Sequence, residues 1–182
     1  MSANPILTSI TAARQMLADC FYWRRIAGGD PWTAEQSLAR VHVDALPPPA
    51  EGGEHTLAEL QALRPFAIVS LGEGEAIHFD MDGSGNCCVG VGGSIDIYIE
   101  LPVPEDLKNS PSALAADVYD RIGRVLRTAN SSEPGLCDLA GLPGYLALRR
   151  ATLQAYYRST RQERLELGDF TAIHLSLRWG RS

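Results

Sequence analysis

The second half of the chain predicts a strand, a helix and two further strands, in that order. Residues 94–103, 145–157 and 171–179 alternate apolar and polar side chains, which is the period of a half-buried β-strand. Residues 111–129 instead repeat apolar side chains at three- and four-residue steps, as in a helix that packs one face on a core. This order restricts the fold to an α+β domain with the helix on one face of a mostly antiparallel sheet.

The same alternation predicts which side chains of these strands face the core. In the first strand the core face carries Ile95, Ile97, Ile99 and Leu101. In the last strand it carries Ile173, Leu175, Leu177 and Trp179. The residues between them, such as Tyr98 and His174, are predicted to point the other way.

The first half of the chain adds one long helix and two strands to this pattern. Asn4 and Pro5 form a typical helix start, and apolar residues then recur at helical spacing as far as Phe21. Asp30 and Pro31 form a second helix start, which predicts a short helical turn to about Leu38. Strands are predicted over residues 40–46 and 66–71, and Thr56 with Glu59 forms a capping box for a short helix between them. We therefore predict a single domain over residues 1–182 with the element order α-β-β-β-α-β-β.

Two polar segments interrupt this order and are predicted to be loop insertions, near residues 47–55 and 80–93. The first is rich in Pro, Gly and Glu. The second contains the glycine-rich run 82–86 between two apolar stretches, which predicts a hairpin or a mobile loop. Both are long and polar, so we expect them to reach a neighbouring molecule.

Composition excludes several classes of protein. With 182 residues, 45% hydrophobic and 21% charged, the chain has the balance of one ordinary globular domain. No apolar run approaches the roughly 20 residues that span a bilayer, and the N-terminus lacks the pattern of a signal peptide. We therefore expect a protein that is cytoplasmic when made and that has no membrane partner. Its cysteines form no C-x-x-C pair and are predicted to be reduced, packed thiols: Cys20, Cys87, Cys88 and Cys137.

The net charge of −6 disfavours a general nucleic-acid binder. The charge is distributed unevenly along the chain. Residues 61–110 contain eight acidic side chains against Arg64 and Lys108, whereas residues 111–182 contain ten arginines against seven acidic side chains. Such a chain can associate with itself or a partner through complementary faces, although scattered solvated charge explains the same counts.

No motif predicts catalysis, and we expect neither an enzyme nor a bound cofactor. Residues 80–86 resemble the first half of a calcium loop, but the twelfth position is Val91 where such a loop has a bidentate acid, so a polar hairpin tip is favoured over a metal site. The glycines of residues 90–93 precede a strand and not the helix that a phosphate loop needs. The four histidines do not have metal-ligand spacing, and no G-x-S-x-G elbow is present.

Several side chains admit a structural and an interaction role. Arg149, Arg150, Arg158, Arg161 and Arg164 suit an anionic partner or a subunit contact, and equally a solvated strand face and turn. Three aromatic residues near the end of the first helix are favoured as core and not as interface anchors: Tyr22, Trp23 and Trp32.

The layout from Pro65 onward resembles the tail-terminator, or tail-completion, proteins of long-tailed phages and prophage-derived particles. The resemblance is carried by residues 64–69, by residues 93–99, by the 118–126 helix containing Ile122 and Gly123, by the strand start at residues 144–146, and by residues 168–170 leading to 177–180. It covers most of the chain and is one of pattern, not of a diagnostic motif.

The resemblance implies a structural virion protein without an active site. Such proteins form a ring, usually a hexamer, at the head-proximal end of the tail tube, stop its polymerisation and join it to the neck, and DNA can pass through the ring. The implied partners are further copies of the chain, the tail-tube protein and a neck or head-completion protein. Contacts are then expected from the two insertions and the 161–168 turn, at Glu51, His55, Asp80, Asp82, Asn86, Arg158, Arg161 and Arg164.

The chain departs from the family pattern by its insertions between Ala45 and Thr56 and between Asp80 and Gly93. Those insertions leave the docking partner open, and a neck, head-closure or other tail component is the nearest alternative. Two further alternatives come from other classes of protein. One is a small ligand- or metal-binding domain that uses Glu75, Asp80 and Asp82, and the other is an interaction module unrelated to phages.

Overall fold

The chain forms one α+β unit, in which a six-stranded mixed sheet packs against helices. The computed structural model describes residues 5–72, 77–81, 87–91, 93–125, 141–142, 146–156 and 170–180. The helices and 3-10 turns are α1 (Pro5–Asp19), η1 (Trp23–Arg25), α2 (Ala34–Leu38), α3 (Leu57–Leu63), η2 (Glu105–Leu107) and α4 (Pro111–Val125). The strands are β1 (Val41–Val43), β2 (Phe66–Leu71), β3 (Ile77–Met81), β4 (Cys87–Val91), β5 (Gly93–Pro102), β6 (Gly141–Leu142), β7 (Leu146–Tyr156) and β8 (Phe170–Gly180).

The strand order of the main sheet is β1-β2-β5-β8-β7-β6. Among these described strands only β1 and β2 run parallel, and every other neighbouring pair is antiparallel. Strand β5 therefore lies between β2 and β8, with Ile97 opposite Val69 on one side and Leu175 on the other. This confirms the predicted α+β class and the mostly antiparallel sheet.

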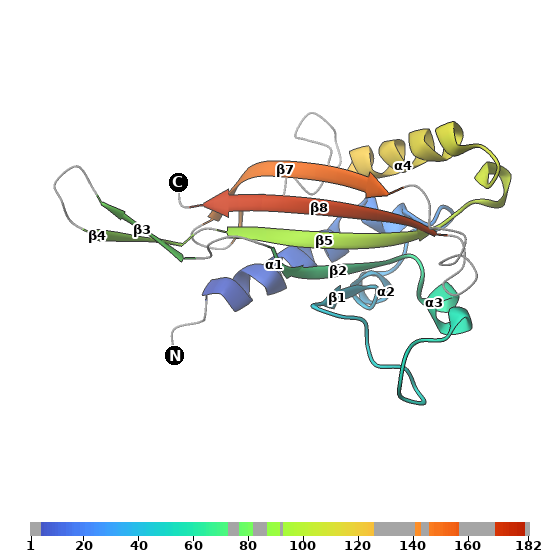
Figure 1. Cartoon of the computed structure of the whole chain (residues 1–182), viewed down its shortest axis with the longest axis horizontal. Helices are drawn as coiled ribbons and strands as arrows, with labels where there is room; N and C mark the ends of the chain where they lie inside the picture. Colours follow the sequence, from blue (N-terminus) through green and yellow to red (C-terminus); the bar gives the residue numbers. More distant parts are fainter. Residues whose placement is uncertain are drawn as a thin grey trace.

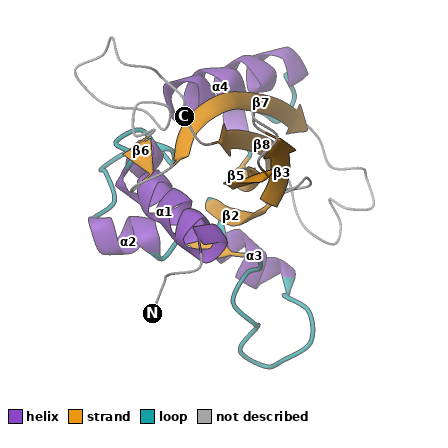
Figure 2. Cartoon of the chain, turned by 90° about the vertical axis from the view of Figure 1, so that its left-hand side faces the viewer, coloured by secondary structure: helices purple, strands orange, loops and turns teal. Residues whose placement is uncertain are grey.

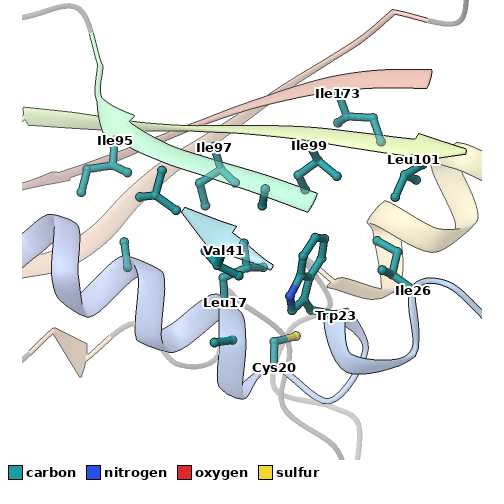
Figure 3. Packing of buried hydrophobic residues seen from close by; sticks show 14 of the residues in the cluster. Leu17, Cys20, Trp23, Ile26, Val41, Ile95, Ile97, Ile99, Leu101 and Ile173 are labelled. Atoms are coloured by element: carbon teal, nitrogen blue, oxygen red, sulfur yellow. The ribbon is translucent and has the colours of Figure 1, made fainter. Parts of the chain in front are cut away.

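The described long helices contribute to one core on one face of this sheet. Ile10, Ala13 and Leu17 of α1 are buried in the same cluster as Leu114 and Val118 of α4. The sheet contributes the predicted face of β5, whose four apolar residues are all at most 2% exposed, together with Ile173 of β8. Figure 3 shows the β5 side chains lying opposite Leu17, Cys20 and Trp23. Because alternation fixes the face of each strand residue, the core positions of β5 were predictable from the sequence.

The segment after α1 is where the prediction needs correction. The Asp30-Pro31 pair was a candidate helix start, but the N-cap of α2 is Thr33, whose hydroxyl accepts from the Gln36 amide at 3.2 Å. The Gln36 side chain in turn accepts from the Thr33 amide at 3.0 Å, so both orphan amides are satisfied. The N-cap of the helix is therefore three residues after Asp30.

Strand β1 is shorter than the predicted 40–46 strand. Asp44 has a φ of 61°, in the left-handed region that turns the chain out of the sheet. Its amide still donates to the Val69 carbonyl at 3.0 Å, and the chain then leaves β2. Ala45, which belongs to the predicted strand, consequently lies outside β1. The last four residues of the predicted 111–129 helix, residues 126–129, lie outside the described residues.

Candidate functional site

Two segments extend from the body of the domain, and both coincide with the predicted insertions. The chain from residue 47 to 55 forms a loop that hangs away from β1 and α3 (Figures 1 and 2). The β3–β4 hairpin lies beyond the end of the main sheet from which β5 starts, at the left of Figure 1. It pairs as a separate two-stranded sheet. Sequence reasoning thus located both projections.

The 47–55 loop is closed at its base by His55. The His55 Nε2 atom donates to the Pro47 carbonyl oxygen at 2.8 Å, which joins the two ends of the loop. Between these ends, Gly52 and Gly53 adopt positive φ values of 77° and 80°, which favour glycine. Glu51 lies exposed on the loop. His55 therefore has a structural role, and its predicted subunit contact, like that of Glu51, stays a prediction.

The loop ends in the predicted capping box of α3. The Thr56 amide donates to Glu59 Oε2 at 2.8 Å, and the Glu59 amide donates to Thr56 Oγ1 at 3.3 Å. Hydrogen bonds to the carboxylate, first from the Thr56 amide and then from its hydroxyl, lower the pKa of Glu59. The second end of the loop is therefore anchored to a helix N-terminus.

The hairpin register separates apolar from polar positions. Ile77 pairs with Val91, Phe79 with Val89 and Met81 with Cys87, so these six apolar residues occupy positions on one face of the ribbon. The alternate pairs, His78 with Gly90 and Asp80 with Cys88, occupy positions on the other face. An isolated two-stranded hairpin is at best marginally stable in water, so an amphipathic hairpin set apart from the main sheet suits a partner surface.

One large apolar side chain stands exposed beside the base of this hairpin. Leu71 is 46% exposed at the last position of β2, just before the chain passes to β3. Its register partner Ile95 is buried. The core face of the sheet therefore continues as accessible apolar surface where the hairpin leaves the body.

Five of the eight predicted contact residues lie outside the described residues: Asp82, Asn86, Arg158, Arg161 and Arg164. Of the other three, the structure places Asp80 in β3 and Glu51 and His55 in the 47–55 loop. These two segments lie in different directions from the domain body (Figures 1 and 2). The predicted contact residues that are described thus fall into two separate groups.

Sequence reasoning missed a buried polar cluster on the second face of the sheet. Arg64 Nε donates to Glu100 Oε2 at 2.8 Å, and the Tyr98 hydroxyl donates to Glu100 Oε1 at 2.8 Å. The Arg64 guanidinium also lies 4.5 Å from the centre of the Phe170 ring. The alternation correctly placed Tyr98 and Glu100 opposite the core, but no local signal indicates a pair separated by 36 residues.

A second polar pair lies farther along the same face. His174 Nε2 lies 3.3 Å from Asp96 Oδ2. The two residues are diagonal neighbours on β8 and β5, because His174 is directly opposite Tyr98. The second face of the sheet thus carries cross-strand polar pairs next to the buried Phe66, which lies directly opposite Glu100.

His42 of β1 is expected to make stability depend on pH. Burial and then the nearby positive charge of Arg14 lower its pKa below 6.5. Below about pH 6.5 the unfolded chain therefore binds more protons than the folded chain, so this contribution to stability is fully present above that pH and is lost as the pH falls. We expect the free energy of unfolding of a His42→Gln variant to fall less than that of the wild type between about pH 7.5 and 5.5.

Urea titrations at a series of pH values measure this effect. The other three histidines are present in both proteins, so the difference between the two curves isolates His42. Parallel curves for the two proteins would contradict the prediction.

Comparison of the sequence with protein-family models and with curated proteins finds no match. In the part of the chain that the structure describes, no helix is long and apolar enough to cross a membrane. The same residues contain no group of three or more acidic, histidine or cysteine side chains placed to hold a metal ion.

Proposed function

We propose that the chain is a structural assembly protein that resembles a phage tail terminator. In this proposal, copies of the chain close into a ring at the head-proximal end of a tail tube, stop its growth and join it to the neck. The observation that carries the proposal is the β3–β4 hairpin, which extends beyond the main sheet with apolar positions on one face. Such a hairpin gains stability by packing on another molecule.

The core of the domain does not depend on the two projecting segments, which supports the same proposal. The main sheet, α1 and α4 share a core, and none of the described residues of that buried cluster comes from the 47–55 loop. The hairpin pairs as a sheet of its own. A packed body that carries projecting segments is the arrangement expected when a scaffold presents contact loops. Apart from the short elements α2, α3 and β6 and the 3-10 turns, the element order is the predicted α-β-β-β-α-β-β, with the hairpin added between β2 and β5.

Two measurements test this function: electron microscopy of the purified protein, alone and mixed with the tail-tube protein, and the mass of the protein in solution. We expect closed rings, or caps at one end of tubes that then stop growing. A monomer that neither forms rings nor touches tubes would overturn the proposal. A ring that binds only the neck component would favour the alternative of a neck or head-closure protein.

Deletion of residues 83–86 is expected to abolish ring formation and to leave the fold intact. These residues connect β3 to β4 in the chain, and the two strands belong to the proposed contact surface. The fold should survive because β3 and β4 form a sheet separate from the one that carries the core. Thermal unfolding measures the fold, and sedimentation measures assembly. Glu35→Ala, at an exposed position of α2, is the control that should change neither. Unfolding of the deletion variant, or rings of normal size, would count against the proposed role of the hairpin.

A further inference from the structure

The described strands bring arginines together at the end of the main sheet from which the hairpin extends. Arg150 of β7 lies directly opposite Arg178 of β8, and Arg149 occupies the irregularity in the β7 register beside them. On the other side of β8, the position opposite Arg178 is Ser94. Like charges opposite one another destabilise a sheet, and neither residue directly opposite Arg178 is an acid. The diagonal position on β5 is Asp96, whose carboxylate pairs with His174. This arginine cluster, Arg149, Arg150 and Arg178, therefore favours an anionic partner.

Strand β7 also offers an edge where such a partner can bind. Within the described residues, β6 pairs only with Leu146 and Ala147, so β7 from Leu148 onward has one hydrogen-bonded neighbour, β8. Helix α4 lies near the C-terminal end of β7, away from the start of that strand (Figure 1). An edge strand can accept an additional strand through its backbone groups. The arginines disfavour pairing of two β7 edges with each other and admit an acidic strand.

The hairpin has the complementary composition. Residues 73–91 contain four acidic side chains and no lysine or arginine. One of them, Asp80, lies in β3, at a position on the polar face of the hairpin. Residues 146–164, which include β7, contain five arginines and one acidic side chain. The hairpin extends away from its own sheet (Figure 1), so the matching surface is more readily met on another molecule.

We propose that β3 of one copy binds along the start of the β7 edge of a second copy, with Asp80 meeting the arginine cluster. This inference rests on the self-assembly proposed above and names the surface that receives the hairpin. The contact joins two different surfaces, so each copy can donate its hairpin to one neighbour and accept a hairpin from another. Heterologous contacts of this kind close into rings when the rotation between copies allows it.

Charge reversal on either side of the contact tests the proposal. Asp80→Lys places a cation against the arginine cluster, and Arg150→Glu places an acid against the hairpin. We expect each variant to weaken self-association at about 50 mM salt by roughly tenfold or more, because like charges brought together across an interface are strongly unfavourable. Sedimentation equilibrium gives the association constants. Glu35→Lys, an exposed change of equal charge on α2, is the matched control and should associate like the wild type.

An equimolar mixture of the two variants shows whether the contact is between copies. The hairpin of the Asp80→Lys variant, which carries the new cation, fits the β7 edge of the Arg150→Glu variant, which carries the new acid. The hairpin of the Arg150→Glu variant keeps its aspartate and fits the unchanged arginine cluster of the Asp80→Lys variant. We therefore expect the mixture to associate more tightly than either variant alone. Thermal melting of each variant monitors the fold, and Asp80→Asn, which removes only the charge, replaces Asp80→Lys if the latter unfolds.

Three results would overturn the inference: wild-type protein that stays monomeric at every concentration, single variants that associate like the Glu35→Lys control, or a mixture that fails to associate. Loss of DNA binding in Arg150→Glu with unchanged self-association would also overturn it and assign the arginines to nucleic acid. The proposed function fails separately. Rescue in the mixture without any capping of tubes would retain the hairpin contact and reject the tail-terminator role.

Discussion

The Arg64→Ala variant is expected to lose about 3–5 kcal/mol of unfolding free energy, since it leaves a buried carboxylate without its cationic partner. The Arg64 side chain is only 2% exposed and the Glu100 side chain 12%. Glu100 also accepts from the Tyr98 hydroxyl, but that neutral donor cannot compensate a full charge. The variant also removes the guanidinium that lies over the Phe170 ring.

Urea denaturation of the wild type, Arg64→Ala, Glu100→Gln and the double variant measures this effect as a double-mutant cycle. The control is Arg124→Ala, because Arg124 pairs with Asp120 on the exposed face of α4, where both side chains are more than half exposed. That surface pair should contribute less than about 1 kcal/mol. A loss of similar size for Arg64→Ala and Arg124→Ala would show that burial does not strengthen the Arg64–Glu100 pair.

The Trp23→Ala variant is expected to lose about 3–5 kcal/mol, because it opens a cavity in the hydrophobic core cluster. Trp23 is 0% exposed and packs among side chains of α1 and β5 (Figure 3). Its ring also makes an edge-to-face contact with Trp32 at 5.8 Å between centroids. Such contacts add to the burial of apolar area.

Trp23→Phe is the matched control for this variant. The Trp23 Nε1 atom is buried and has no hydrogen-bond partner among the described residues, so replacing the indole by a phenyl ring breaks no hydrogen bond there. We therefore expect a clearly smaller loss than for alanine, set by the smaller cavity. Equal losses for the two variants in thermal and urea unfolding would contradict the cavity explanation.

The candidate interface was predictable to the extent that its signals are local. Glycine and proline content located the 47–55 loop, and the run of residues 82–86 between apolar stretches located the hairpin. The prediction assigned His55 only to a contact, whereas the fold also uses its ring to close the loop on the Pro47 carbonyl. The Arg150–Arg178 juxtaposition was not predictable, because the two positions meet only through the register of β7 and β8.

Sequence alone determined which face each residue of β5 presents and where α4 begins. Alternation and helical spacing are local properties, and they act within a few residues whatever the rest of the chain does. The capping box of α3 is local in the same sense, since Thr56 and Glu59 are three residues apart.

Only the tertiary structure decided which strands are neighbours and which distant residues pair. Nothing in residues 41–43 indicates that they run parallel to β2, nor does any local pattern indicate that β3 and β4 leave the main sheet as a separate ribbon. The tertiary structure also decided that Arg64 pairs with Glu100. It likewise decided that Trp23 is fully buried whereas Trp32 is only partly buried. These features depend on contacts between segments far apart in the chain. The free energy of such contacts is shared over the whole core, and no local periodicity in the sequence reveals them.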